Sequence, residues 1–367
     1  MARKAKREPK TSSKLPPDAE KSLSHSDAEA GELFNLAIRV EELAPWRWME
    51  ETDLIGIENP ETGEIGFISV MGSVEEYEAI AVYLGAEGFY GFIDFVEDDT
   101  ATADRLVELP HLQAAFSERK YLQKQDRDLI KFWGLKSSGA KVWPMFRSYR
   151  PGYFPWFVTI AEARFLIHAL SQILDVARRV RDDVRPFRPT GRVEKDGYLM
   201  RVSRKEGSQL VWEDQVWRIP KPTAGPIRTA IDGQVLESLK QISSGRLDLE
   251  ADFLLSPASI GKRGQRPLAV YTLMIADHDS GFIFGFDVMS VEDSPSAMHA
   301  RIPNAVAKIL LQNQIVPRRL IVRSDRLRSL LKPLAQSLNI VLQYSDELPS
   351  IDQAAESLGE WLRGGMT

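Results

Sequence analysis

PLAVYTLMIADHDSGFIFGFDVMS (residues 267–290) and RRLIVRSDRLRSLLKPLAQSLNIVLQYSD (residues 318–346) are the two stretches that decide the fold of the carboxyl-terminal third. In the first stretch, apolar runs flank the turn residues of ADHDSG, a pattern typical of two strands joined by a turn. In the second, two short apolar runs flank a segment with helical spacing. With a helix expected at residues 296–312 and another at the carboxyl end, this order predicts a compact ββαβαβα unit.

The remainder of the chain indicates further domains. A chain of 367 residues is long for a single hydrophobic core. The amino-terminal segment is rich in Lys, Ser and Pro and poor in large apolar residues, which is typical of a disordered tail. We therefore expect a mixed architecture of four parts: a disordered basic tail (1–29), an α+β domain (30–183), a small β-rich bridge (190–260) and a carboxyl-terminal α/β unit (261–367).

Apolar spacing and turn residues predict the elements within these parts. DLIGIE and EIGFISVMG flank the turn NPETGE and predict a β-hairpin. We expect helices at residues 32–43, at 74–84 with Gly85 as the stop, twice within 105–133, at 160–180 and at 233–242. The bridge should contain two or three short strands, followed by a strand in LDLEADFLLSP (residues 247–257).

Composition excludes several classes of protein and site. Cysteine is absent, so disulfides, thiolate metal sites and cysteine nucleophiles are excluded. No apolar run approaches the roughly 20 residues that span a bilayer, and the basic start has no apolar stretch after it, so we expect a cytoplasmic protein with no membrane partner. The net charge of −5 argues against non-specific coating of nucleic acid. The charge is uneven, however: acids exceed bases between residues 41 and 100, and bases exceed acids between residues 117 and 205. The two stretches could pair with each other, which is the favoured interpretation, or the second could offer a basic face to an anionic partner.

The stretch WPMFRSYRPGYFPW (residues 143–156) interleaves aromatic rings, prolines and arginines. Its three prolines exclude a helix, so we expect an extended or turning segment. Bases stack on aromatic side chains and arginine contacts phosphates, so the stretch is a candidate surface for single-stranded nucleic acid. It is also a candidate peptide groove, but the favoured interpretation is that its aromatic residues anchor a loop in the core. The candidate binding residues are Arg147, Tyr149, Arg150, Tyr153 and Trp156.

The carboxyl-terminal unit resembles a ribonuclease H-like domain in the order of its strands and helices. Enzymes of that family place one acid on the first strand, one after a later parallel strand and one on a following helix. The resemblance implies that Asp277, Asp325 and Glu356 would be both the catalytic residues and the ligands of Mg²⁺ or Mn²⁺. Asp279 and Asp352 are substitutes.

Two of these acids also have a purely structural interpretation. Asp277 lies in a turn sequence, where Asp is favoured for backbone reasons. Asp325 precedes a helix and would serve as its N-cap. The third antiparallel strand of the ribonuclease H-like order is missing before residue 296, although LDLEADFLLSP could supply one from upstream. His278 and His299 show no ligand spacing such as HExxH, and the chain has no GxSxG, GxGxxG or Walker sequence.

The chain as a whole is similar to a set of bacterial two-module proteins of unknown function. The similarity lies in PWRWMEETDLIGIENPETGEIGFISVMG (45–72), FWGLKSSGAKVWPMFRSYRPGYFPWFV (132–158), RPLAVYTLMIADHDSG (266–281) and SLNIVLQYSDELPSID (337–352). That resemblance implies no cofactor and no catalytic residue. Our first hypothesis is a non-enzymatic binding or interaction protein with a protein or nucleic-acid partner; the alternative is a divalent-metal-dependent nuclease.

Overall fold

The computed structural model describes residues 22–24, 27–72, 77–98, 104–135, 142–182, 197–222, 227–262 and 264–364. The chain divides into two compact units. Unit 1 comprises Met1–Arg150 and Pro155–Thr223, and unit 2 comprises Pro151–Phe154 and Ala224–Thr367. Within the described ranges, no helix is long and apolar enough to cross a membrane.

The expected disordered tail lies mostly outside the described residues. Residues 22–24 and 27–29 are described. Leu23 is buried, and its backbone N–H donates to the carbonyl of Val158 at 2.8 Å. This part of the expected tail is therefore attached to unit 1.

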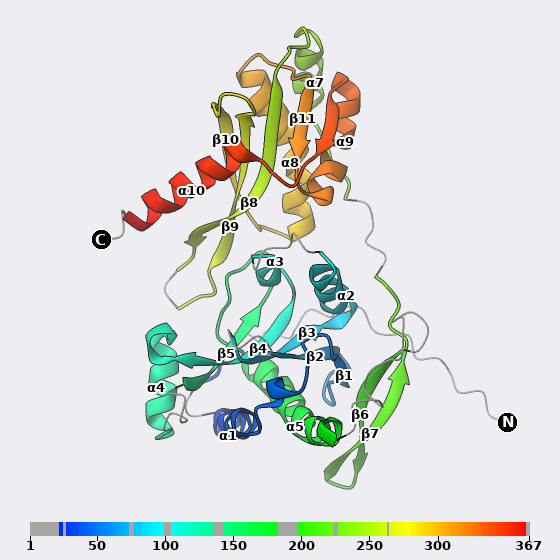
Figure 1. Ribbon diagram of the computed structural model, residues 1–367, viewed down its shortest axis with the longest axis vertical. Helices are drawn as coiled ribbons and strands as arrows, with labels where there is room; N and C mark the ends of the chain where they lie inside the picture. The colour runs from blue at the N-terminus through cyan, green and yellow to red at the C-terminus, as the bar shows by residue number, and fades with distance from the viewer. Residues whose placement is uncertain are drawn as a thin grey trace, which may run out of the picture. The chain divides into compact units, whose positions relative to one another are not determined.

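Unit 1 is built on a seven-stranded sheet in the order β5-β4-β3-β2-β1-β6-β7 (Figure 1). All neighbouring strands pair antiparallel except β1 and β6, which are parallel. The strands are β1 (Ile55–Glu58), β2 (Ile65–Met71), β3 (Ala79–Leu84), β4 (His111–Glu118), β5 (Val142–Tyr149), β6 (Tyr198–Glu206) and β7 (Gln209–Trp217). The predicted hairpin around NPETGE is confirmed as β1 and β2, and the strands expected in the bridge extend this sheet.

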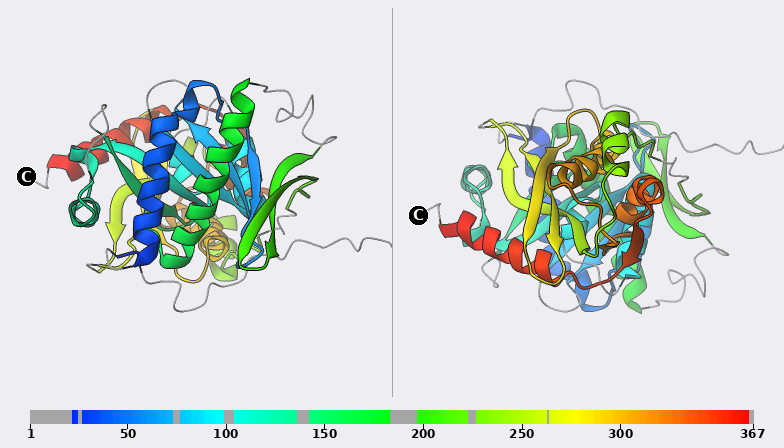
Figure 2. Two further views of the ribbon diagram at one scale, coloured as in Figure 1. Left: turned by 90° about the horizontal axis from the view of Figure 1, so that it is seen from below. Right: turned by 90° about the horizontal axis from the view of Figure 1, so that it is seen from above.

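Helices cover both faces of the first sheet. α1 (Ala28–Leu43) and α5 (Ile160–Asp182) lie side by side across one face (Figure 2). α2 (Gly85–Val96) packs on the other face against β2 and β3. The shorter helices are η2 (Pro45–Arg47), α3 (Asp104–Val107), η3 (Arg119–Tyr121) and α4 (Lys124–Phe132).

One expected helix of unit 1 is a strand in the structure, and one further strand was not expected. β3 occupies the segment for which a helix ending at Gly85 was expected, and α2 begins at Gly85 instead. The two helices expected within 105–133 are present as α3 and α4, but β4 lies between them. The reason is burial on both faces: Ile80 and Val82 pack under α1 and α5, and Ala81 and Tyr83 pack under α2. A strand covered on both sides loses its apolar–polar alternation and cannot be distinguished from a buried helix by spacing.

Unit 2 is built on a five-stranded sheet in the order β10-β9-β8-β11-β12. β8 pairs antiparallel with β9, and β9 with β10, whereas β8, β11 and β12 are parallel to one another. The strands are β8 (Asp248–Ile260), β9 (Leu268–Asp277), β10 (Ile283–Ser290), β11 (Arg319–Val322) and β12 (Val341–Tyr344). The ββαβαβα order expected from the sequence is present, and β8 is the additional strand at the centre of the sheet.

The two faces of this second sheet carry different helices. α7 (Gly233–Lys240), α8 (Pro295–Gln312) and α9 (Asp325–Leu338) contribute to the main core with Leu249, Ala251 and Leu273. On the opposite face, a smaller core joins Leu348 and Ile351, at the start of α10 (Pro349–Gly364), to β9 and β11. In the first half of β8, Leu249, Ala251 and Phe253 belong to the main core, so Glu250 and Asp252 between them point to the α10 side.

Candidate functional site

The three acids singled out from the sequence lie in different settings in unit 2. Asp277 ends β9 and is buried; its Oδ2 accepts hydrogen bonds from the N–H and Oγ of Ser280, as in a turn. Asp325 is the first residue of α9 and its side chain is 86% exposed, while Ser324 is the N-cap. Glu356 is exposed on α10. Among the described residues, no group of three or more His, Asp or Glu side chains could hold a metal ion.

β8 carries acids that the sequence analysis did not single out. Glu250 and Asp252 are 0% and 4% exposed, and they lie two residues apart on the face that α10 partly covers. The alternation in LDLEADF, acid against apolar residue, was the available signal. The segment lies in the expected bridge (190–260), and although it was expected to be able to supply a strand to the terminal unit, the ribonuclease H-like order was matched to the strand that ends at Asp277.

Arg323 forms the centre of an ionic cluster with Asp252 and Asp352. The Nε of Arg323, the residue after β11, lies 2.6 Å from Oδ2 of Asp252, and a terminal nitrogen of Arg323 lies 2.7 Å from Oδ1 of Asp352 on α10. Burial raises the pKa of Asp252, and the guanidinium opposes this rise. Three segments distant in sequence thus meet at one guanidinium.

A second network beside this cluster holds the first turn of α10. Oε1 of the fully buried Glu250 lies 2.7 Å from Nδ1 of His278, and Oε2 accepts the backbone N–H of Ile351 at 3.0 Å. Ser350 Oγ donates to the carbonyl of Asp277 at 2.9 Å. The first backbone N–H groups of a helix have no acceptor within the helix, so a carboxylate that accepts one of them supplies the missing partner. Its negative charge also interacts favourably with the positive end of the helix dipole. The network therefore anchors α10 and gives these buried groups structural partners.

The aromatic–proline segment of unit 1 places its arginines toward acids of the same unit. Arg147 on β5 is 5% exposed and forms a two-pronged ion pair with Asp126 of α4, with N···O distances of 2.9 and 2.6 Å. Its guanidinium also lies over the ring of Phe157, 4.7 Å from the centroid. Arg150 is paired with the buried Glu162 at 2.9 Å. Arg147 has almost no accessible surface left for a partner.

The other candidates of this segment are half-buried. Tyr149 donates its hydroxyl to Gln113 Oε1 at 3.0 Å. Trp156 exchanges backbone hydrogen bonds with Ser148 on β5. Tyr153, which belongs to unit 2, forms an isolated bridge with Leu268. The pairing of β5 with β4 and of Ser148 with Trp156 explains why the backbone of the segment is extended in unit 1.

The ring of Tyr149 stacks on His111 of β4, with centroids 3.9 Å apart, and this contact leads to a prediction on pH. Burial lowers the pKa of His111 to about 4 from 6.5, against a hydrogen bond to the carbonyl of Leu109 that raises it. Because the folded pKa is below the unfolded one, the stabilisation is present above pH 6.5 and is lost as the pH falls toward 4. We expect unit 1 to lose about 2 kcal/mol between pH 7 and pH 5 through this group.

The measurement is urea denaturation at several pH values. His111→Phe keeps the ring and removes the titration, so its free energy of unfolding should fall less over the same pH range. Identical pH slopes for the variant and the parent protein would show that His111 is not the responsible group.

The two units correspond to two family models. Residues 31–198, almost all in unit 1, match a domain of unknown function (DUF7309), and residues 235–359, in unit 2, match a second domain of unknown function (DUF6930). A comparison with curated proteins found no match. The chain thus combines two modules, each similar to a family to which no activity is assigned.

Proposed function

We propose that this protein is a non-enzymatic binding or interaction protein, and that unit 2 is a ribonuclease H-like domain without metal-dependent chemistry. The strand order of the second sheet supports the fold proposal: three antiparallel strands come first in the chain, and two further strands, each preceded by a helix, lie parallel to the first. In that order the first strand is β8, so the acid expected on the first strand corresponds to Asp252.

The observation that carries the functional proposal is Arg323 between Asp252 and Asp352. Two-metal catalysis needs carboxylate oxygens that are free to bind two cations about 3.5–4 Å apart. Here the acid of the first strand, Asp252, and the acid of the last helix, Asp352, both bind the guanidinium of Arg323. This group stays charged at all relevant pH values. A divalent cation would have to take the place of the guanidinium on these carboxylates, and the positive guanidinium would then lie next to the positive ion. The residues present therefore do not fit a two-metal site.

The test is a calorimetric titration of the full chain with Mg²⁺ and with Mn²⁺, together with a nuclease assay on single- and double-stranded DNA and RNA. We expect no saturable binding below about 10 mM and no cleavage above a reaction without protein. Metal-dependent cleavage that is lost in Asp252→Asn but retained in Glu356→Gln would overturn the proposal and favour the nuclease. Loss in Asp277→Asn or Asp325→Asn would point instead to the acids that were singled out from the sequence.

We also propose that the protein is bacterial and lies in the cytoplasm. The resemblance to bacterial two-module proteins supports a bacterial protein of the cytoplasm. Fractionation of cells that express the full chain with a carboxyl-terminal tag should place it in the cytoplasmic fraction; recovery in the periplasmic or membrane fraction would contradict this.

A further inference from the structure

Unit 2 contains a cavity of about 410 Å³ on the side of the sheet away from α10. It lies between β10, α8 and the segment that precedes α7. Its volume is within the range of about 300–1,000 Å³ found for small-ligand sites. The lining residues come from these three segments: Arg228, Ala230, Asp287, Val288, Met289, Ala300, Arg301, Asn304, Ala305 and Lys308.

The cavity is positively charged although the whole chain is acidic. Arg228, Arg301 and Lys308 face it together with a single acid, Asp287. Among the residues that the structure describes, neither Arg228 nor Lys308 has an ion-pair partner, so both charges are available. Because Glu292, outside the lining, is paired with Arg301, the charges left for a ligand are those of Arg228, Lys308 and Asp287, which together are positive and attract an anion.

Part of this lining is held in place by contacts outside the cavity. One terminal nitrogen of Arg301 lies 2.9 Å from Glu292 Oε1, and the other donates to the carbonyl of Ser290 at 3.0 Å. Asn304 Oδ1 accepts the backbone N–H of Asp232 at 2.9 Å. These bonds fix the direction of the two side chains before any ligand arrives, which lowers the entropy cost of binding.

We infer that this cavity binds a phosphate-bearing small molecule of mononucleotide size. A phosphate monoester has a charge of about −1.5 to −2 at pH 7 and three acceptor oxygens, which can accept hydrogen bonds from Arg228 and Lys308. Met289 and Ala305 offer an apolar wall for the organic part of the ligand, and Asp287 and Asn304 offer hydrogen-bonding groups for its hydroxyl or amino groups. This inference deepens the proposed binding function and names its ligand class.

The experiment is calorimetric titration of the full chain at about 50 mM salt with three probes: adenosine 5′-monophosphate, adenosine and inorganic phosphate. We expect the monophosphate to bind, inorganic phosphate to bind more weakly and adenosine not to bind. Binding should weaken by about tenfold or more in Arg228→Ala and in Lys308→Ala, because each change removes a charge-assisted hydrogen bond. Higher salt should also weaken it.

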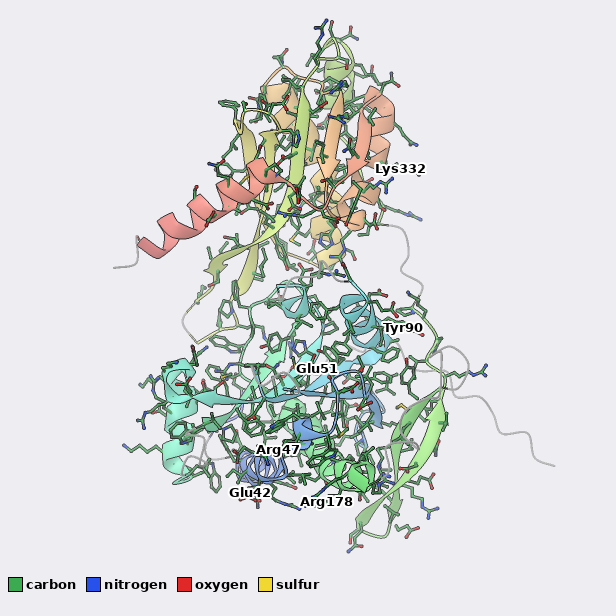
Figure 3. The ribbon with its side chains drawn as sticks, in the orientation of Figure 1. Glu42, Arg47, Glu51, Tyr90, Arg178 and Lys332 are labelled. Atoms are coloured by element: carbon green, nitrogen blue, oxygen red, sulfur yellow. The ribbon has the colours of Figure 1, made fainter. Side chains whose placement is uncertain are left out.

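The matched control is Lys332→Ala. Lys332 is an exposed cation of α9 that does not line the cavity (Figure 3), so this variant loses the same charge and should bind like the parent chain. Absence of monophosphate binding at millimolar concentration, or binding that is equal in Arg228→Ala and the parent chain, overturns the inference. Binding of a 12-nucleotide single strand without binding of the monophosphate also overturns it, in favour of nucleic acid. The titration with metal ions is a separate experiment. A negative result with adenosine 5′-monophosphate would therefore leave unchanged the proposal that Asp252, Arg323 and Asp352 do not form a metal site.

Discussion

Arg147→Met is expected to lower the free energy of unfolding of unit 1 by about 3–5 kcal/mol. The side chains of Arg147 and Asp126 are 6% and 5% exposed, so the variant leaves a carboxylate buried without its counter-ion. The variant also loses the hydrogen bond from the guanidinium to the carbonyl of Phe146 and the contact with the ring of Phe157. Removal of one partner costs far more than the intact pair contributes, because the remaining charge cannot reach water.

Urea denaturation followed by tryptophan fluorescence measures this effect in unit 1, since seven of the eight tryptophans lie there and only Trp361 belongs to unit 2. Arg150→Met is the matched control: Arg150 is 31% exposed, and Glu162 retains bonds from Ser148 and Thr159, so we expect a loss of about 1 kcal/mol or less. Adding Asp126→Asn to Arg147→Met should restore part of the stability because it removes the buried charge. A loss below 1 kcal/mol in the single variant would mean that Asp126 reaches solvent.

Arg323→Met should destabilise unit 2 by about 2–4 kcal/mol at pH 8, and by less at pH 5. Asp252 is buried, and its pKa is already raised by burial in the presence of Arg323, so removal of the guanidinium raises this pKa further. A carboxyl group with a folded pKa above its unfolded value binds its proton more tightly in the folded state. Its unfavourable effect is therefore absent at acid pH and develops as the pH rises from about 4 through the raised pKa.

Hydrogen exchange of peptides from β8 and α10, compared at pH 5 and pH 8 after correction for intrinsic exchange rates, reports this difference. Arg328→Met is a suitable control, because Arg328 is 51% exposed and its pair with Asp325 spans 3.7 Å on the surface of α9. We expect little change in the control at either pH. Equal destabilisation of the Arg323 variant at both pH values would show that Asp252 does not remain buried when its partner is removed.

Local patterns were sufficient for much of the fold. The turn NPETGE between two apolar runs predicts the hairpin of β1 and β2, and the helical spacing at residues 160–180 predicts α5, because each signal depends on neighbours in the chain. The same reasoning was wrong for β3, where helices on both faces of the sheet remove the polar half of the pattern.

The candidate site depended on contacts that no local pattern contains. Asp277 and Asp325 were singled out by the ribonuclease H-like resemblance, with a turn role and an N-cap role as the local alternatives. The turn role is present at Asp277, which Ser280 binds, but the N-cap role expected of Asp325 was wrong, because Ser324 caps the helix that Asp325 begins. Asp252 and Arg323 are separated by 71 residues, and their pairing exists because β8 is inserted beside β11. The position of β8 is a property of the whole sheet.

The sequence by itself determined the order of strands and helices in unit 2, the acid–apolar alternation at the start of β8 and the absence of cysteine chemistry, because each depends on residue type and short-range spacing. Only the tertiary structure decided which charges meet. Burial makes an ion pair necessary at Asp126 and at Asp252. Their partners lie on other segments of the chain, Arg147 on β5 and Arg323 directly after β11. In the terminal unit whose acids first suggested metal chemistry, the closest cation to the central carboxylate is an arginine of the same chain.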